Sequence, residues 1–302
     1  MPELPDIEDY LRALRVRILG QPLLKARITS FSLLKTYDPP ISAIEGQAVT
    51  ALSRLGKRIV LHFGKEHPSE QLHAVLHLMI AGRLAWHDEP GKPVPKKIGH
   101  AGFDFRSGTL ILREAGTKKR ASLWIVRGDE ALAEHDRGGL DPMALDLPGF
   151  KEVLLRTNRT LKRALTDQHQ LSGIGNAFSD EILLAAHVSP VKTTAKLTDP
   201  EWSRLHQATQ AVLGLWVHRL AERTSDGFPD KVTAFREDFG AHGKFGKPCP
   251  QCGTTIQRIR YAANETNYCP LCQTGGKVLA DRSLSRLLKD DWPRTVEELE
   301  GD

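Results

Sequence analysis

The chain has 302 residues, and 40% of them are apolar, which predicts packed cores for one large domain or two smaller ones and excludes a disordered protein. Lysine and arginine number 42 against 37 acidic residues, giving a formal net charge of +5 that permits a polyanionic partner without requiring one. The sequence has no run of 18 apolar residues and no charged-then-apolar leader, so we expect a cytoplasmic protein.

The first ten residues, MPELPDIEDY, allow two interpretations of Pro2. In the first, Pro2 stands before or in the first turn of a helix, where proline is well tolerated, and the acids that follow complement the positive helix end. In the second, Met1 is removed and Pro2 becomes the N-terminus, with a secondary amine that can act as a nucleophile. These ten residues alone do not decide between the two roles.

Residues 20 to 127 carry short apolar runs with period-two stretches, separated by Gly, Pro and charged turns. This pattern predicts a β-rich domain after one N-terminal helix. The expected strands are ITSFSLL, RIVLHF, HAVLHLMI, TLILRE and SLWIVRG. The Gly- and Pro-rich stretch 137–149 is the expected hinge, and from residue 151 onward the periodicity is helical.

Within the helical part, residues 161–190 predict two helices joined by a glycine-containing turn. One helix is expected to end near Asp167, and the next to begin at about Asn176, after Gly173 and Gly175. Glycines before a helix N-terminus let backbone N–H groups approach a phosphate, where the helix dipole also favours an anion. The alternative is an ordinary helical turn whose glycines relieve steric strain.

The four cysteines form the strongest single pattern, C-x2-C-x16-C-x2-C, at Cys249, Cys252, Cys269 and Cys272. Two tight turns of this kind each present two thiolates to one tetrahedral ion, so the spacing predicts one structural Zn²⁺. Disulfides are the alternative, but a chain without a leader is expected to keep its thiols reduced. The residues between the cysteine pairs have the composition of a β-hairpin.

The chain continues about 30 residues beyond Cys272. Apolar Leu284, Leu287 and Leu288 stand at helical spacing in this extension. This spacing predicts a helix that packs back on the body of the protein, with a structural rather than a chemical role.

Four motifs occur in the order found in the formamidopyrimidine-DNA glycosylase / endonuclease VIII family, which this chain resembles: MPELPDIE, RLGKR at 54–58, SGIGNAFSDEIL and the four-cysteine finger. Leu4 resembles the formamidopyrimidine branch. The resemblance implies an α+β fold with an N-terminal β-sandwich, a helix–two-turn–helix domain and a β-hairpin zinc finger, with DNA bound between the halves. The expected domains are the sandwich (1–136), hinge (137–149), helical domain (150–240), finger (241–275) and extension (276–302).

The resemblance also assigns roles to individual residues. It implies that Pro2 is the catalytic nucleophile and that Glu3 is the acid/base that opens the sugar ring and shuttles protons. Lys57 would hold the lesion phosphate and assist proton transfer. Further expected DNA contacts are Lys162, Gly175 and Asn176. Asp6 and Glu181 match acidic family positions, for which a helix-capping or solvated role is an equal alternative.

The implied reaction is excision of an oxidised or ring-opened base from damaged double-stranded DNA, followed by β- and δ-elimination at the abasic site. The target nucleotide must be flipped out, because its C1′ is otherwise shielded by the stack. A secondary amine suits this chemistry, since its iminium is cationic without protonation. We expect a monomer that works at the bacterial nucleoid and needs no membrane.

The sequence departs from the family where the hole left by the flipped base is filled. Ile80 stands where a methionine is expected, and the basic stretch Lys118, Lys119 and Arg120 replaces a loop with an Arg-x-Phe pair. In the finger, Asn264 occupies the position of a phosphate-binding arginine. These four positions and Asn264 are the expected but altered contacts to DNA.

Two other functions stay open. A catalytically narrowed paralogue would act mainly as an abasic-site lyase or bind damaged DNA, but the retained Pro2, Glu3 and Lys57 argue against complete loss of catalysis. An RNA- or protein-binding zinc-ribbon protein is the second alternative, and it would need none of the motifs before residue 249.

Overall fold

The structure is a computed structural model that describes residues 1–64, 67, 69–261, 264–281 and 293–300. The chain divides into two compact units. Unit 1 comprises Met1–Arg137 and Trp216–Thr233, and unit 2 comprises Gly138–Leu215 and Ala234–Asp302.

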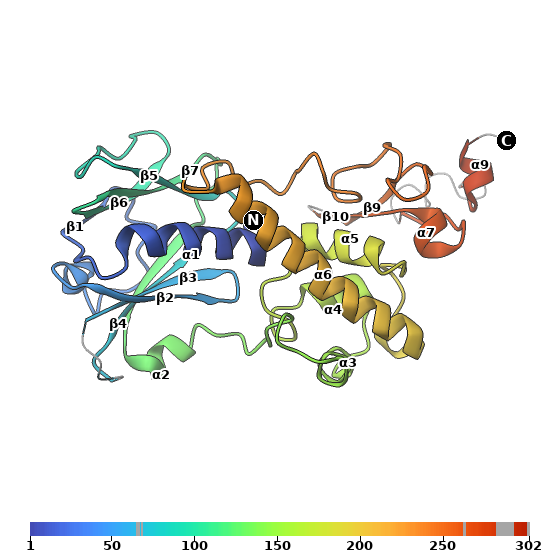
Figure 1. Cartoon of the computed structure of the whole chain (residues 1–302), viewed down its shortest axis with the longest axis horizontal. Helices are drawn as coiled ribbons and strands as arrows, with labels where there is room; N and C mark the ends of the chain where they lie inside the picture. The colour runs from blue at the N-terminus through green and yellow to red at the C-terminus, as the bar shows by residue number, and fades with distance from the viewer. Residues whose placement is uncertain (65–66, 68, 262–263, 282–292, 301–302) are drawn as a thin grey trace. The chain divides into compact units, whose positions relative to one another are not determined.

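Unit 1 contains two antiparallel four-stranded sheets (Figure 1). One has the strand order β1-β6-β7-β5 and the other the order β2-β3-β4-β8. The strands are β1 (Lys25–Ile28), β2 (Val49–Leu55), β3 (Arg58–Phe63), β4 (Leu72–His77), β5 (Gly82–His87), β6 (Gly99–Phe105), β7 (Gly108–Glu114) and β8 (Ser122–Arg127). The short helices η1 (Ile41–Ile44) and α2 (Gly128–Ala133) complete this part of the chain. The inner faces of both sheets contribute to one hydrophobic core.

Helix α1 (Leu4–Ile18) closes this core along one side. It begins directly after Glu3, whose N–H donates to the Asp6 carboxylate at 2.8 Å. Its apolar residues recur at helical spacing and are buried together with side chains of both sheets, namely Ile7, Leu11, Leu14 and Ile18. The helix therefore fixes the N-terminal residues against the sandwich.

Most of the expected strands are confirmed. RIVLHF, TLILRE and SLWIVRG form β3, β7 and β8, while HAVLHLMI forms β4 only as far as His77. The prediction for ITSFSLL is wrong, because β1 ends at Ile28 and the chain then turns. The N–H groups of Thr29 and Ser30 both donate to the carbonyl of His100, and the Leu33 N–H donates to Ser30, which closes a turn instead of a ladder.

Unit 2 holds the predicted helix pair. Helix α4 (Leu161–Thr166) ends at Asp167, and α5 (Asn176–Ala185) begins after Gly175, as the sequence predicts. The helices around this pair are α3 (Leu147–Leu155), η2 (Thr194–Lys196) and the first part of α6 (Asp199–Thr224), which ends in unit 1. The predicted hairpin between the cysteine pairs is present as β9 (Gln257–Tyr261) and β10 (Asn264–Tyr268), followed by α7 (Pro270–Thr274).

The C-terminal extension is described in part. Leu284, Leu287 and Leu288 lie outside the described residues. The short helix α9 (Val296–Glu300) follows a segment that pairs with residues after the finger, where the Val278 N–H donates to the Arg294 carbonyl at 2.9 Å. No helix among the described residues is long and apolar enough to cross a membrane. The mixture of sandwich, helical domain and finger hairpin confirms the predicted α+β fold.

Helix α1 offers a direct test of this core. Leu14 is fully buried, whereas Val16 on the same helix is 81% exposed. Leu14→Ala should lower the free energy of unfolding by about 2–5 kcal/mol, because it removes buried methyl groups and leaves a cavity. Val16→Ala, the matched control, should change it by no more than about 0.5 kcal/mol. Urea unfolding followed by tryptophan fluorescence measures both, and equal effects would contradict this placement of the helix.

Candidate active site and nucleic-acid interface

The first residues of the chain are buried in unit 1. Pro2 and Glu3 are both buried, with Glu3 only 4% exposed. Glu3 is the residue before the first helical turn, and the Ile7 N–H donates to its carbonyl at 3.0 Å. Asp6 accepts the Glu3 N–H, so its carboxylate caps the helix. Asp6 therefore stabilises the start of α1, and the residues directly before this helix, Pro2 and Glu3, are buried in the fold.

Burial also changes the electrostatics of the chain end. The N-terminal amine in the structure belongs to Met1, and burial lowers its pKa below that of an exposed N-terminus. Glu3 opposes this effect, whereas Arg83 and Lys57 add to it. A lower pKa leaves an amine neutral, and therefore nucleophilic, down to a lower pH. An amine held at this position meets that requirement of a catalytic nucleophile.

Lys57 lies on the tight turn between β2 and β3. Gly56 has a φ of +61°, which a glycine adopts without strain and which lets the chain reverse directly before Lys57. The Lys57 side chain is only 7% exposed, unlike that of an ordinary turn lysine. Its charge acts on the N-terminal amine and on His77. The structure therefore places Pro2, Glu3 and Lys57 in one electrostatic environment.

The turn between β4 and β5 presents Ile80, which is 59% exposed. Met79 adopts a left-handed φ of +52°, and its N–H donates to Nδ1 of His77 at 3.0 Å. Burial and the neighbouring cations, with Arg58 first among them, lower the pKa of His77 to about 4. The neutral imidazole therefore accepts at Nδ1 and carries its proton on Nε2. One side chain thus holds the turn that carries Ile80.

Arg83 reinforces the same turn from the other side. Its guanidinium donates to the carbonyls of Ile80 at 3.1 Å and Gly82 at 2.6 Å. Its Nε donates to the carbonyl of Val232 at 2.6 Å. These bonds fix Arg83 to backbone in unit 1, so its role is to support the turn.

The loop 115–121, between β7 and β8, is held by the buried Glu114. The Glu114 Oε2 atom accepts the backbone N–H groups of Arg120 at 2.9 Å and Ala121 at 3.2 Å. Nε2 of the buried His100 lies 3.4 Å from the same oxygen. The side chains of the basic stretch 118–120 are exposed at the end of this anchored loop. The hydrogen bonds to Glu114 therefore hold the backbone of the loop that carries the basic stretch.

In unit 2, the expected contacts Lys162 and Asn176 are joined to each other. Lys162 Nζ donates to the backbone carbonyl of Asn176 at 2.7 Å and also binds the carboxylate of Asp180, which is fully buried. His242 Nδ1 lies 2.8 Å from the other Asp180 oxygen. An ammonium has three N–H donors, so these two bonds leave one for another partner. Sequence spacing had given no sign of Asp180 or His242.

Asn176 and Gly175 occupy the start of α5. Gly175 is the residue before the first turn of α5, and Asn176 Nδ2 donates to the carbonyl of Glu265 in the finger hairpin at 3.0 Å. This bond uses one of the two N–H groups of the side-chain amide. This hydrogen bond links the start of α5 to the finger hairpin within unit 2. The helix dipole favours an anion at the start of α5.

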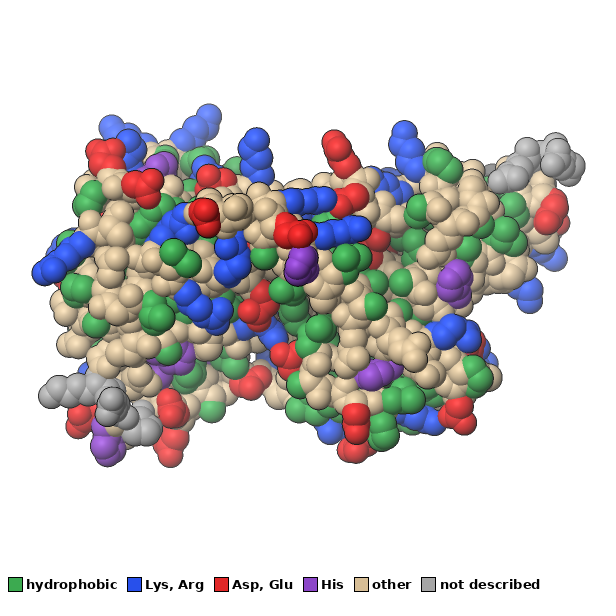
Figure 2. All heavy atoms as spheres, viewed as in Figure 1, with side chains coloured by type: hydrophobic (Ala, Val, Ile, Leu, Met, Phe, Trp, Pro, Cys, Tyr) green, Lys and Arg blue, Asp and Glu red, His purple; other side chains and the backbone are tan. Residues whose placement is uncertain are grey.

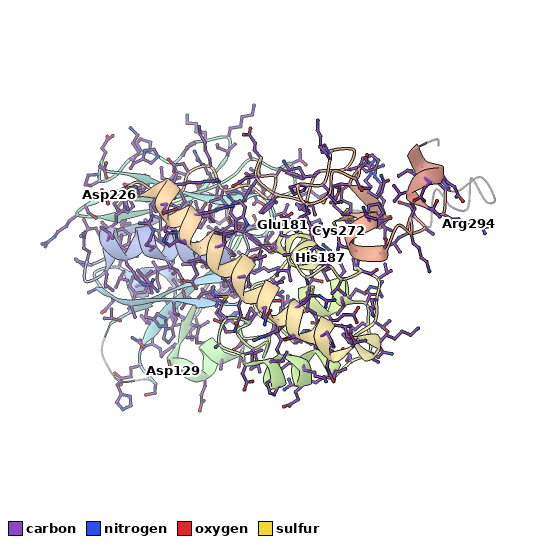
Figure 3. All side chains as sticks on the ribbon, turned by 45° about the vertical axis from the view of Figure 1, so that its right-hand side comes forward. Asp129, Glu181, His187, Asp226, Cys272 and Arg294 are labelled. Atoms are coloured by element: carbon purple, nitrogen blue, oxygen red, sulfur yellow. The ribbon has the colours of Figure 1, made fainter. Side chains whose placement is uncertain are left out.

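Glu181, labelled in Figure 3, has a structural environment. Its carboxylate accepts the backbone N–H groups of Gly240 at 2.8 Å, Ala241 at 2.9 Å and His242 at 2.8 Å. Burial raises its pKa, and these three bonds oppose that rise. Glu181 therefore anchors the segment before the finger, a role that is neither helix capping nor solvation, because residues 240–242 form a loop and the carboxylate is buried.

The four cysteines meet at one point in unit 2, and Figure 3 labels Cys272. All four are free thiols, and their sulfur atoms lie within 4.8 Å of one another. The 3.4 Å between the sulfurs of Cys252 and Cys269 excludes a disulfide and is near the spacing of about 3.8 Å expected around tetrahedral Zn²⁺. A cluster of four thiols fits one structural zinc ion and leaves no ligand position for catalysis.

Asn264 is the first residue of β10. Its side chain lies outside the described part of the structure. A contact between Asn264 and DNA therefore stays a prediction from the sequence.

The surface charges do not form one basic region on the visible face of the molecule. On the face of the molecule shown in Figure 2, lysine and arginine side chains are mixed with acidic ones rather than gathered in a single patch. The net charge of +5 is therefore no guide to an interface on this face. The better candidates for DNA contacts are individual cations held in place by the fold, such as Lys57 and Lys162.

Comparison with known proteins accounts for the three parts of the chain. Residues 1–121 match the formamidopyrimidine-DNA glycosylase N-terminal domain, residues 139–226 the formamidopyrimidine-DNA glycosylase H2TH domain, and residues 246–275 a zinc finger found in FPG and IleRS. A formamidopyrimidine-DNA glycosylase of Heliobacterium modesticaldum is 31% identical over 284 residues, 90% of this chain and 100% of that protein. The chain belongs to the formamidopyrimidine-DNA glycosylase family.

Other relatives in this glycosylase family match the same share of the chain. A formamidopyrimidine-DNA glycosylase of Bacillus cereus is 29% identical over 282 residues, 90% of this chain and 99% of that protein. Among solved structures, the complex of Lactococcus lactis Fpg with DNA containing an abasic site is 25% identical with a TM-score of 0.76. The similarity covers 90% of this chain and 99% of the Lactococcus protein. The family resemblance and the zinc finger predicted from the sequence are confirmed.

The finger yields a prediction about metal. Cys269→Ser should reduce bound zinc from one ion per chain to none, because a hydroxyl does not replace a thiolate in a four-cysteine site. It should also expose the finger to limited proteolysis, since the metal supplies most of its folding energy. Ser172→Ala, a similar small change in unit 2 away from the cysteines, is the control. Metal analysis measures the stoichiometry, and full zinc in the Cys269 variant would contradict the assignment.

Proposed function

We propose that this protein is a DNA glycosylase and abasic-site lyase of base excision repair, which removes oxidised or ring-opened bases from double-stranded DNA. The observation that carries the proposal is the burial of the chain end in one electrostatic environment with Glu3 and Lys57. Membership of the formamidopyrimidine-DNA glycosylase family supports the substrate class. We further propose that it acts as a monomer in the bacterial cytoplasm, on the nucleoid.

In this mechanism the nucleophile is the secondary amine of Pro2, after removal of Met1. The nitrogen attacks C1′ of the flipped nucleotide, and the bond between C1′ and the damaged base breaks as the base leaves with its electron pair. Opening of the sugar ring and loss of the amine proton then give an iminium, a C1′=N⁺ bond. Because proline is a secondary amine, the iminium nitrogen has no proton to lose, so the intermediate stays cationic at any pH until water releases the amine.

In the proposed mechanism, Glu3 moves the protons that these steps require. It adjoins Pro2 in sequence and is buried, and its charge acts on the N-terminal amine of Met1, one residue before Pro2. As a general acid it protonates the ring oxygen when the sugar opens, and as a carboxylate it can then accept the proton lost from C2′. Loss of that proton expels the 3′ phosphate by β-elimination, and δ-elimination next breaks the C5′–O bond. The products are the free base, an unsaturated sugar fragment and a gap with phosphate ends.

Lys57 and the residues of unit 2 serve DNA binding in this proposal. Lys57 would neutralise the phosphate of the lesion, which explains why a cation is held on a fixed turn near the amine. Lys162 keeps one N–H for a phosphate, and the start of α5 at Gly175 and Asn176 adds backbone donors. The zinc ion would hold the finger hairpin, to which Asn176 is bonded, in its folded form.

A second candidate is a narrower enzyme that acts mainly on abasic sites. The observation in its favour is the loop 115–121, which presents three cations and no aromatic side chain where the family resemblance expects an Arg-x-Phe pair. Cations attract phosphate but cannot stack into the gap left by a flipped base. Such a protein would keep the lyase steps and lose speed on bases that pair and stack well.

The nucleophile can be identified by trapping. Protein without Met1 should form a borohydride-stable crosslink to abasic DNA through residue 2, because borohydride reduces the iminium to a stable amine. Pro2→Gly should reduce the yield of this crosslink at least about tenfold, since a primary amine needs an extra proton to form the same cation. Mass spectrometry of the digested adduct identifies the attached residue. An adduct on Lys57 or another lysine would show that the proposed nucleophile is wrong.

Two controls distinguish loss of the Pro2 amine from damage to the fold. Protein that retains Met1 should bind an abasic-site duplex and give no crosslink, because Pro2 then lies in a peptide bond. Val16→Ala leaves the site untouched on the same helix and should give the normal yield.

Lesion preference follows from the altered loops. We expect slow excision of 8-oxoguanine opposite cytosine, which still stacks and pairs, and faster action on abasic sites, ring-opened purines, hydantoins or lesions in bubbles. The physical reason is that an extrahelical base costs a few kcal/mol of stacking, and an aromatic side chain that could recover part of it is missing. In addition, β-branched Ile80 is stiffer than methionine. Single-turnover rates on duplexes of matched sequence measure the preference.

A variant tests the cause of that preference. Lys119→Phe restores an aromatic ring to the exposed part of the loop and should raise the rate on 8-oxoguanine opposite cytosine more than the rate on abasic sites. If wild-type protein excises 8-oxoguanine opposite cytosine as fast as hydantoins, the argument from the missing aromatic fails.

A further inference from the structure

Several loops of unit 1 leave the sheet β1-β6-β7-β5 at the same edge (Figure 1). Neighbouring strands are antiparallel, so the end of β1, the start of β6, the end of β7 and the start of β5 lie together. The turn that carries Ile80 and the loop 115–121 are attached to this edge. Residues 29–37 after β1 and residues 94–98 before β6 are attached to it as well. We call residues 29–37, 94–98 and 115–121 the edge segments.

Phe31 stands on a turn whose backbone is fixed at this edge. The Ser30 N–H donates to the carbonyl of His100 in β6 at 3.2 Å, and the Leu33 N–H donates to the Ser30 carbonyl at 3.1 Å. The Leu33 carbonyl accepts the N–H of Leu123 in β8 at 2.9 Å. Leu33 is fully buried in the main core, whereas the side chain of Phe31, two residues earlier, is 99% exposed. The fold therefore fixes the backbone around Phe31 and directs its ring into solvent.

The edge segments are basic and contain no acidic residue. Their six cations, all exposed, are Lys35, Lys96, Lys97, Lys118, Lys119 and Arg120. The Glu114 N–H donates to the carbonyl of Ile98 at 2.8 Å, which joins the segment 94–98 to the start of the loop 115–121. Lys35 and Lys119 each donate to a backbone carbonyl, and an ammonium has three such donors. This local charge favours a polyanion.

An exposed ring among cations suits an unpaired strand of nucleic acid. A single exposed phenylalanine needs no ligand to explain it, so the fixed turn and the cations beside it carry the inference. Cations bind backbone phosphates, and an aromatic ring stacks on any base, because every base has a flat π face. In a paired duplex those faces are covered by the neighbouring bases. A base that has lost its partner and its stack leaves a face open to Phe31.

The edge is continuous with the part of unit 1 that holds Lys57. The β2–β3 turn with Lys57 lies at the end of β3, which pairs with the end of β4 at His77. The chain then passes through the Ile80 turn into the start of β5, which belongs to the edge. A strand that is bound at Lys57 can therefore continue along the edge segments.

We propose that Phe31 stacks on an unpaired base near the lesion while the cations of the edge segments bind phosphates of the same strand. This inference rests on the proposed glycosylase function and names a substrate class for it, namely lesions in DNA with unpaired neighbours, such as bubbles. Phe31 does not replace the missing wedge. Its strand β1 is two strand spacings, about 10 Å, from β7, which leads into the loop 115–121.

The test compares two DNAs in binding to the full-length, zinc-loaded protein. Both carry the same non-cleavable abasic analogue, which lies in a fully paired duplex in one and in a mispaired bubble in the other. Fluorescence anisotropy gives both dissociation constants. Phe31→Ala should weaken binding to the bubble about tenfold, as expected for one lost stack, and binding to the paired duplex less than about twofold. Phe31→Trp should keep the affinity for the bubble, and Phe31→Leu should not, because leucine has no planar ring.

Tyr37→Ala is the matched control. Tyr37 belongs to the same segment and is 92% exposed. Leu34 pairs with Leu123 in parallel, and Thr36 Oγ1 accepts the Ile125 N–H at 2.8 Å, so the chain follows β8 away from the edge before it reaches Tyr37. Tyr37→Ala should leave both affinities unchanged. Circular dichroism and zinc content establish that each variant is folded.

The salt dependence separates the ring from the charges. Phe31→Ala removes no cation, so the slope of log K against log salt for the bubble should stay the same while the affinity falls. A changed slope would mean that the substitution disturbs the phosphate contacts instead of a stack, and this result would contradict the inference.

The remaining outcomes distinguish the inference from the proposed function. Equal weakening of both DNAs by Phe31→Ala, an unchanged affinity for the bubble, or an equal loss in Tyr37→Ala would each overturn the role of Phe31. In all three cases the wild-type protein still binds the abasic analogue, and the proposed function stands. If the wild-type protein binds neither DNA, the proposed function fails together with the inference.

Discussion

The proposed chemistry requires the end of the chain to be held inside a folded domain, and the packing of helix α1 meets that requirement. A chain end is normally the least ordered part of a protein. Here the helix begins at Leu4, and its apolar face is buried between two sheets, so residues 2 and 3 have no freedom to fray. Asp6 adds the one hydrogen bond that the Glu3 N–H would otherwise lack. The hydrophobic core of unit 1 therefore also determines the position and the basicity of the N-terminal amine.

The loops around this end are rigid for a different reason. They have little apolar surface of their own, so side chains from neighbouring strands satisfy their backbone groups. His77 holds the N–H of Met79, and Glu114 holds the N–H groups before β8. His77 is half-buried and Glu114 is buried, whereas Ile80 and the basic stretch 118–120, which these anchored turns carry, are exposed. Ordering these loops in the free protein reduces the entropy lost when DNA binds, which is the usual benefit of preorganisation.

Much of this arrangement could be predicted from the sequence, because its signals are local. The zinc site follows from cysteine spacing, and the α4–α5 turn follows from two glycines between helical periods. RIVLHF, HAVLHLMI, TLILRE and SLWIVRG were predicted as strands, whereas KARI, VTALSRL, GRLAWH and GHAGFDF were not. Small, polar or charged residues interrupt the apolar alternation in these four segments. ITSFSLL has strand-like composition, but the bonds of its backbone to His100 turn the chain.

The contacts that the sequence could not predict all join residues that are distant along the chain. Asp180 meets His242, and Glu114 meets His100, only because strand register and helix packing bring them together. Acidic and basic side chains are mixed on the visible surface, so attraction at long range is weak, and affinity for DNA must come from a few cations fixed at short range.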